Sequence, residues 1–400
     1  MSSLAITSRI AVASAASLAA QALFGLLMLR LFSPPDVGAF TVVAQISFFW
    51  MTLALAQSPL SFLANIHLSP VQALRQALRT SVARWLLLAP VAAAALWVAK
   101  LPSFWPFLAW AGGMALLQMG WYMAQPWALR TGSARSAALA RAVPPILAVV
   151  IAGATGMLWT GSGPVGLLLA ATVSYGIGAL WLLRREQGVA APEATTAPGL
   201  APKTPAQQDD RSAGLRLAHT VADAIAGTAV LLVWQRAYGL AEASYVAVLL
   251  RLLGLFPAVV YAAWPQVLLS RGQQRRTLSA WVGFGGAGAT ALAGLAAALA
   301  LHTGWFAPSW QGLAAYIAPL VLWQCSACLF AAHGHMPFQR GMARQFSWAT
   351  IGFNTLQLGV LMLPLTLHSL GPVAHVWWLA GSSALGLLAL TVWVAGKNLK

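Results

Sequence analysis

Apolar runs long enough to cross a membrane follow one another along almost the whole sequence. A hydrocarbon core about 30 Å thick is spanned by roughly 20 residues of α-helix. Twelve runs of about this length, bounded by charged residues, Pro or Gly, lie near residues 10–31, 39–62, 82–99, 104–124, 142–160, 164–183, 215–237, 243–268, 279–301, 313–332, 347–367 and 373–395. The sequence therefore predicts an all-α integral membrane protein with about 12 transmembrane helices.

The composition argues against a water-soluble fold. Hydrophobic residues make up 60% of the chain and charged residues 8%, which leaves too little polar surface to cover a soluble globule. The 23 Lys and Arg residues outnumber the 7 Asp and Glu residues, a balance that favours either nucleic acid or anionic lipid as a partner. Because the basic residues occur one to three at a time between apolar runs, we expect membrane lipids and no nucleic acid.

One pattern, a basic residue followed by an acid and then by a proline, occurs in both halves of the chain. Its members lie 206 residues apart and are Arg30, Asp36 and Pro59 in the first half and Arg236, Glu242 and Pro265 in the second. Residues 184–214 between the halves are rich in Ala, Pro, Thr and Gln and cannot bury enough apolar surface to fold alone. We therefore predict two six-helix lobes, residues 1–185 and 214–400, joined by a flexible cytoplasmic linker at 186–213.

The distribution of Lys and Arg predicts the orientation. With twelve spans and a cytoplasmic N-terminus, most of the basic residues fall on the cytoplasmic side, as the positive-inside rule requires. Arg141 is among them, in a loop before the span at 142–160. We expect a multi-pass protein of the inner membrane with both termini in the cytoplasm.

The deepest basic residue of the predicted spans is Arg251. It lies about eight residues into the eighth span, on the order of 12 Å from the outer end. A cation at that depth is costly, and such residues are most often functional. We predict a cavity site for an anionic group there; an interhelical pair or a snorkelled side chain is the alternative.

A polar stripe follows the seventh span, where Arg216, His219, Thr220 and Asp223 share one helical face at three- and four-residue spacing. Imidazole titrates near neutral pH. We predict that Asp223, with His219 and Arg216, couples transport to a gradient, and the pattern does not choose between protons and sodium. The alternative is a local network between Arg216 and Asp223 at the interface. No cofactor is expected.

Arg30 and Arg236 stand at the outer ends of helices, each six residues before an acid, Asp36 and Glu242 respectively. Each acid could pair with its basic neighbour across a tight turn, and snorkelling plus such a pair is the favoured interpretation. We expect Arg236 and Asp36 to act at a gate.

Uncharged hydrogen-bonding residues also recur on single helical faces. They are Ser14, Ser17 and Gln21 in the first span, Gln118, Tyr122 and Gln125 in the fourth, and Asn354 and Gln357 in the eleventh. Such stripes suit a cavity that holds sugars, although hydrogen bonds between helices use the same residue types. Because the repeat sets Gln45 opposite Arg251, we predict Gln45 and Gln21 as cavity residues.

Motifs for catalysis or metal binding are not evident. The sequence contains no paired carboxylates, no histidine and acid cluster with metal spacing, and no G-x-S-x-G. Cys325 and Cys328 form a C-x-x-C without a second pair, and we interpret them as packing residues. We expect neither an enzyme nor a metal site.

The first copy of the repeat resembles the polysaccharide and O-antigen flippases of the multidrug/oligosaccharidyl-lipid/polysaccharide flippase superfamily. That family begins with a helix ending in a basic residue, then a short turn with Pro and an acid, Gly-x-aromatic, and a long second helix. The matching residues here are Arg30, Pro35, Asp36, Gly38 and Phe40.

The second copy resembles the start of the family's second half, with Tyr245 and Arg251 in its tyrosine and downstream arginine pattern. It departs from the pattern at Ser244, which stands where the first copy has Gly38. The family's acid in the seventh helix would fall several residues after Asp223.

The resemblance implies a MATE-like flippase fold. It implies movement of an undecaprenyl-pyrophosphate-linked oligosaccharide to the periplasmic leaflet, for lipopolysaccharide O-antigen or other surface polysaccharide, with polymerase and chain-length proteins as candidate partners. Arg251 is the first choice for the headgroup contact and Arg30 the second. The alternatives are a drug or cation exporter of the same superfamily, with a more acidic and aromatic cavity, and a polysaccharide polymerase or ligase, with a large periplasmic loop.

Overall fold

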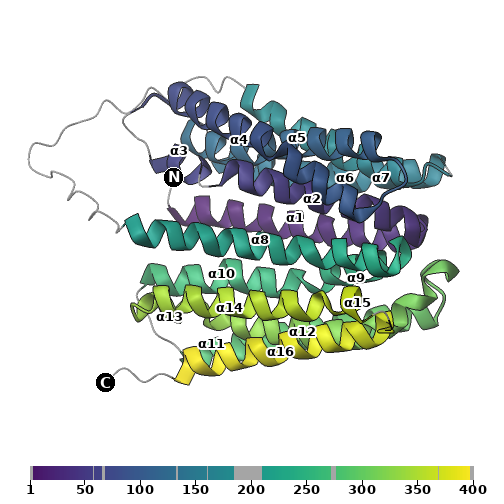
Figure 1. Ribbon diagram of the computed structural model, residues 1–400. Helices are drawn as coiled ribbons and strands as arrows, with labels where there is room; N and C mark the ends of the chain where they lie inside the picture. The colour runs from purple at the N-terminus through teal and green to yellow at the C-terminus, as the bar shows by residue number, and fades with distance from the viewer. Residues whose placement is uncertain are drawn as a thin grey trace, which may run out of the picture. The chain divides into compact units, whose positions relative to one another are not determined.

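The computed structural model describes residues 3–56, 58–64, 68–131, 134–159, 161–183, 210–271, 276–367 and 369–396. Throughout these residues the regular structure is α-helix with short 3-10 turns, and none of it is strand. The helices of each half run roughly parallel or antiparallel to one another (Figure 1). The predicted linker at 186–213 lies outside the described residues, except for its last residues, which begin a helix.

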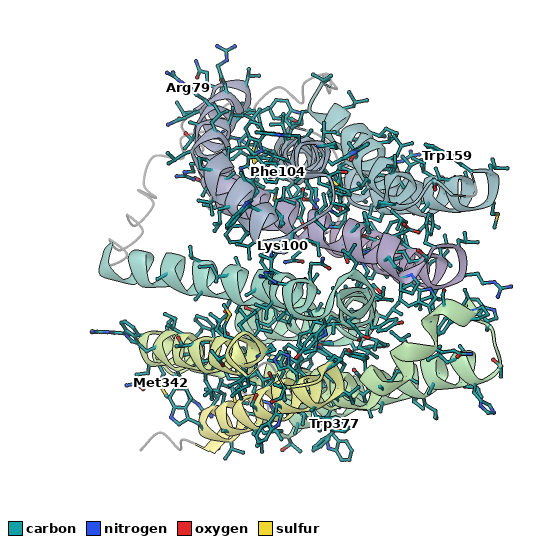
Figure 2. All side chains as sticks on the ribbon, turned by 45° about the vertical axis from the view of Figure 1, so that its right-hand side comes forward. Arg79, Lys100, Phe104, Trp159, Met342 and Trp377 are labelled. Atoms are coloured by element: carbon teal, nitrogen blue, oxygen red, sulfur yellow. The ribbon has the colours of Figure 1, made fainter. Side chains whose placement is uncertain are left out.

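The described chain divides into two compact units, of which the first comprises Met1–Leu27 and Ala39–Leu217. The elements of the first half are α1 (Ser3–Leu31), α2 (Pro34–Leu55), α3 (Ser58–Ala64), α4 (Pro70–Ala99), α5 (Phe104–Thr131), α6 (Ala134–Leu158), α7 (Pro164–Ala179) and the 3-10 turn η1 (Leu180–Leu183). Helix α5 is central, because it packs on α4, α6 and α7. Lys100, in the left-handed conformation at φ 50°, ends α4 and turns the chain toward Phe104 at the start of α5 (Figure 2).

The second unit comprises Met28–Gly38 and Ala218–Lys400. Its elements are α8 (Asp210–Tyr238), α9 (Leu240–Leu253), α10 (Leu255–Arg271), α11 (Arg276–His302), η2 (Pro308–Leu313), α12 (Ala314–His333), α13 (Met336–Gln339), α14 (Ala343–Leu361), α15 (Leu363–Thr366) and α16 (Pro372–Gly396). Helix α12 is central here, because it packs on α9, α10, α11 and α16.

The offset found in the sequence reappears in the helix starts. Helices α2 and α9 begin at Pro34 and Leu240, and α4 and α11 begin at Pro70 and Arg276, so that both pairs are 206 residues apart. The central helices α5 and α12 follow next in each half. The same order of helices is thus built twice from different side chains.

Ten helices of the described residues are long and apolar enough to cross a membrane. The predicted spans that fall outside these ten coincide with α5 and α8, which have 28 and 29 residues and therefore exceed the roughly 20 that a span needs. The prediction of an all-α multi-pass membrane protein is confirmed.

The eighth predicted span is two helices rather than one. Helix α9 ends at Leu253 and α10 begins at Leu255, with Gly254 between them. Pro257 lacks the N–H that would bond to the carbonyl of Leu253, so the helical hydrogen-bond ladder is interrupted at this point. Broken helices of this kind are tolerated in membranes where the freed backbone groups are buried in protein or line a cavity.

Candidate functional site

The turn between α1 and α2 is fixed by hydrogen bonds to the segment that precedes α12. The Trp310 indole donates to the carbonyl of Phe32 at 3.1 Å, and the Ala307 amide donates to the carbonyl of Leu29 at 3.3 Å. The Arg30 guanidinium donates to the carbonyl of Trp305 at 2.7 Å. All of these residues belong to the second unit. Arg30 is therefore held by a backbone carbonyl, a group that suits a cation.

Asp36 lies in the first turn of α2 and accepts a hydrogen bond from the Ser33 hydroxyl at 2.5 Å. A carboxylate in this position also interacts favourably with the positive end of the helix dipole. In the second half, Glu242 occupies the first turn of α9 and accepts a hydrogen bond from the Tyr316 hydroxyl. The two acids of the repeat thus bond to hydroxyl groups, whereas Arg30 bonds to a carbonyl and Arg236 is exposed.

Aromatic and polar side chains join the ends of α8, α14 and α16 near Glu242. Trp234 stacks on the buried His375 with ring centroids 4.3 Å apart. The two nitrogens of His375 lie 3.2 Å from the Tyr238 hydroxyl and 3.2 Å from the carbonyl of Val360. The sequence does not predict this network, because its members come from three helices and only the repeated acid, Glu242, marks this end of the second half.

Asp223 and Asn354, from the predicted polar stripes of the seventh and eleventh spans, meet in the second unit. The Asn354 amide donates to the Asp223 carboxylate at 2.5 Å. Asn354 is buried and Asp223 is exposed. One turn further along α14, Gln357 donates to the Ser383 hydroxyl of α16 at 2.8 Å. An acid near the middle of α8 therefore has an uncharged amide as a partner.

The backbones of Arg216 and His219 belong to α8, but their side chains lie outside the described residues. Their predicted part in the coupling site stays a prediction.

The four predicted cavity residues divide between the two units. Gln21 and Gln45, both half-buried, belong to the first unit, and Gln21 donates to the Ser17 hydroxyl at 3.4 Å. Arg30 and Arg251 belong to the second. Arg251 is half-buried in the last turn of α9, just before the break at Gly254. A cation in this position interacts favourably with the negative end of the helix dipole.

Arg141 lies inside α6 rather than in a loop, so its predicted position was wrong. It donates to the Gln125 amide oxygen at 3.3 Å and to the Ser14 hydroxyl at 2.9 Å. These bonds bring together the polar stripes of the first and fourth spans. Helix α6 begins earlier than expected, at Ala134, because its first turns are rich in Ala, which has the highest helix propensity.

Cys325 and Cys328 pack α12 against α11, as predicted. The Cys325 thiol donates to the carbonyl of Ala287 at 3.3 Å, and the buried Cys328 lies 3.5 Å from the Thr290 hydroxyl. Within the described part of the chain, no group of three or more His, Cys, Asp and Glu could hold a metal ion.

No protein-family model and no curated protein sequence matches this chain. Among solved structures it resembles one described as "Lipid II flippase MurJ, inward closed conformation", with a TM-score of 0.64 and 11% identity over 97% of this chain and 87% of that chain. It also resembles a MATE transporter in complex with MaL6, with a TM-score of 0.52 and 13% identity over 97% of this chain and 95% of that one. The chain has the MOP flippase fold.

This result confirms the predicted MATE-like flippase fold. At sequence identities of 11% and 13%, these similarities establish the fold and nothing more. One fold can serve many functions, so the function of this chain has to be argued from its own site residues.

Proposed function

We propose that this protein is a flippase that moves an undecaprenyl-pyrophosphate-linked oligosaccharide to the periplasmic leaflet of the inner membrane. Two six-helix lobes, residues 1–185 and 214–400, would alternate access to the substrate, with both termini in the cytoplasm. The product would feed a surface polysaccharide such as lipopolysaccharide O-antigen, and polymerase and chain-length proteins are the candidate partners.

The position of Arg251 carries this proposal. Arg251 lies within the apolar segment Leu240–Tyr261 and is half-buried there. A pyrophosphate that leaves water needs a charged partner to offset its desolvation, and guanidinium groups bind phosphate through paired hydrogen bonds. In many transporters the substrate site lies at broken helices, and Arg251 stands directly before the break at Gly254. Arg30 is the second candidate for the headgroup, and Gln21 and Gln45 are candidates for the sugars.

The Asp223–Asn354 pair supports coupling to a gradient. At membrane depth an ionised carboxylate is costly unless a cation or a proton accompanies it. The Asn354 amide orients the carboxylate. Asp223 is exposed, so that a proton or a sodium ion would have access to it, and His219 and Arg216 are further candidate members of this site. Arg236 and Asp36 remain candidate gate residues.

Replacement of Arg251 tests the headgroup contact. Purified protein in vesicles is given an isoprenyl-diphosphate-linked oligosaccharide, and movement of the lipid between leaflets is measured. We expect Arg251→Ala to slow movement roughly tenfold or more, because a hydrogen-bonded charge pair is lost. Arg251→Lys, which keeps the charge without the paired geometry, should retain part of the rate.

Arg79→Ala is the matched control, since Arg79 is exposed on α4 in the first unit (Figure 2). Its rate should equal that of the wild type. An Arg251→Ala variant that moves the lipid normally would contradict the headgroup assignment. A wild-type protein that moves a cationic drug and not the lipid would favour the exporter instead.

A further inference from the structure

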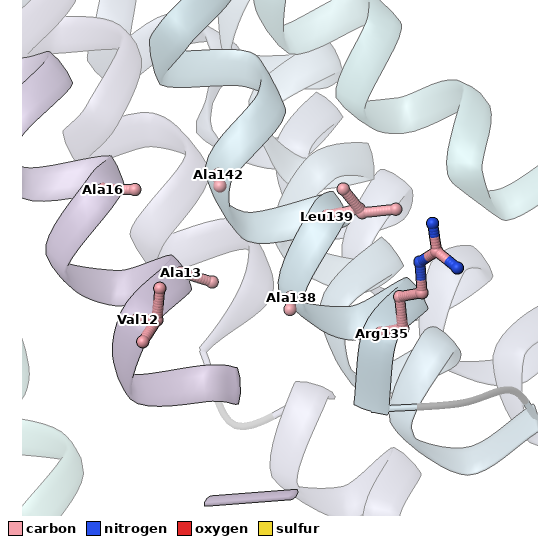
Figure 3. A pocket seen from close by; sticks show the side chains of 7 residues that line it. All are labelled: Val12, Ala13, Ala16, Arg135, Ala138, Leu139 and Ala142. Carbon is pink, nitrogen blue, oxygen red and sulfur yellow. The ribbon is translucent and has the colours of Figure 1, made fainter. Parts of the chain in front are cut away.

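A groove of about 570 Å³ runs between α1 and α6 in the first unit (Figure 3). Its volume lies within the range of known small-molecule sites, roughly 300–1,000 Å³. Its walls are Val12, Ala13 and Ala16 of α1 and Ala138, Leu139 and Ala142 of α6, with Arg135 at the start of α6. None of these residues belongs to the transport site proposed above.

The alanines of the groove would ordinarily bring two membrane helices into contact. Ala13 and Ala16 of α1 lie across from Ala138 and Ala142 of α6 (Figure 3). Small residues on facing helices allow close approach of the backbones, yet here they border open space. Because Val12 and Leu139 are exposed, the groove opens at the surface of the first unit, where a molecule of the bilayer can enter it.

A hydrogen bond beside the groove joins its two walls. Arg141 of α6 donates to the Ser14 hydroxyl of α1 at 2.9 Å, and these residues are the neighbours in sequence of Ala142 and Ala13. The link tethers the two helices through polar side chains, while their alanines stay apart. The groove is therefore bounded by a specific contact.

The groove lies near one end of the apolar segments of α1 and α6, where lipid headgroups would meet hydrocarbon. Arg135 lies in the first turn of α6, and the apolar run of α1 follows Arg9 in the sequence. At 1.5 Å per residue, the innermost wall residue, Ala142, is only about 10 Å further along α6. An occupant would have a polar end at the interface and an apolar end in the hydrocarbon.

The residues that line the groove match such an occupant, because they are charged at one end and apolar along the rest. Among the described residues that line the groove, Arg135 is the one that is charged, and its exposed side chain can reach a phosphate at the membrane surface. The other described lining residues are aliphatic. A soluble anion would leave the aliphatic walls without an apolar partner. A neutral lipid would leave the charge of Arg135 without an anionic partner. The ammonium group of a zwitterionic lipid would be repelled by Arg135.

We propose that the α1–α6 groove binds an anionic phospholipid of the bilayer, with one acyl chain between the alanines and the phosphate at Arg135. The lipid completes the packing of α1 against α6 and is distinct from the lipid that is transported.

Native mass spectrometry of the full-length protein in detergent tests the headgroup contact. The protein is mixed with equal amounts of phosphatidylglycerol and phosphatidylcholine of identical acyl chains. We expect a preference of about fivefold for phosphatidylglycerol, the effect of one Arg near an anionic membrane surface. Arg135→Gln should abolish this preference, whereas the control Arg79→Gln, at an exposed site on α4, should keep it.

A second pair of variants tests the groove. Ala142→Leu and Ala16→Leu each fill the space and should reduce bound phosphatidylglycerol severalfold, with normal elution of the folded protein on size exclusion. Ala15→Leu, on an exposed part of α1 that does not line the groove, is the control and should bind lipid normally.

Equal binding of the two phospholipids by the wild type would overturn the proposal, as would normal binding in both filled variants. Displacement of phosphatidylglycerol by an isoprenyl phosphate at equal concentration would also overturn it, because the groove would then belong to the transport path. The assay measures binding alone, so its result is independent of whether the protein is a flippase.

Discussion

Asp223 places an acid near the middle of α8, where Asn354 donates to it at 2.5 Å. The carboxylate is exposed on a helix that we predict to span the membrane. Acids at membrane depth are most often functional, which supports the proposed part of Asp223 in coupling.

Replacing Asp223 by Asn removes the charge and keeps the size of the side chain. We expect the Asp223→Asn protein to retain basal movement of lipid but to lose the acceleration that a proton or sodium gradient produces in the wild type. The measurement is transport into vesicles with and without each imposed gradient. Asp209→Asn, in the polar segment between the halves, removes the same charge elsewhere in the chain and serves as the control. Its transport should be accelerated by the gradient as much as that of the wild type. An unchanged gradient response in Asp223→Asn would remove this residue from the coupling scheme.

The sequence was informative about residue types at membrane depth and less so about their partners. Spacing placed Asp223 and Asn354 on polar faces of the seventh and eleventh spans, but only the hydrogen bond between their side chains shows that they meet. Arg141 was assigned to a loop because clustered arginines usually mark loop ends, whereas its partners, Ser14 and Gln125, come from two other helices. Tertiary hydrogen bonds of this kind leave no signal in local sequence.

At the scale of helices, Gly38 shows why one copy of the repeated turn needs glycine. A Cβ at this position would collide with the carbonyl oxygen of Leu240, the first residue of α9. The start of α2 and the start of α9 therefore approach more closely than any side chain allows. Ser244, which occupies the equivalent position of the second copy, is buried and bonds its hydroxyl to the carbonyl of Ala241.

Gly38→Ala should destabilise the protein by about 1–3 kcal/mol, because an overpacked contact with backbone has to be relieved by movement of a helix. Gly113→Ala is the matched control. Gly113 lies in α5 with open space around its Cα, so alanine should be neutral or slightly stabilising there through its helix propensity. Thermal unfolding in detergent measures both, and equal midpoints for Gly38→Ala and the wild type would contradict the close approach.

The helices themselves were predictable because period and length suffice to recognise an apolar span. The points where a helix is interrupted were harder to predict. The break between α9 and α10 follows from Pro257 and Gly254, yet Pro319 lies within the continuous helix α12. Local sequence does not distinguish the two outcomes, since neighbouring helices decide whether a freed carbonyl is satisfied.

At the scale of the whole molecule, the repeat is the main organising feature. The described chain consists of two bundles with the same helix order, each with a central helix. The offset of 206 residues at α2 and α9 and at α4 and α11 was visible in the sequence. The inclusion of Met28–Gly38 in the second unit was not visible in the sequence, because it depends on hydrogen bonds that this segment makes with Trp305, Ala307 and Trp310.

The central claim is transport of a lipid with an anionic headgroup, and reconstitution of the wild-type protein tests it most directly. Vesicles with and without the protein receive an isoprenyl-diphosphate-linked oligosaccharide in one leaflet, and its appearance in the other is followed with time. We predict that the protein accelerates this movement and that a diphosphate without an isoprenyl chain does not cross. Equal rates with and without the protein, in vesicles where the same protein moves a cationic dye, would contradict the account.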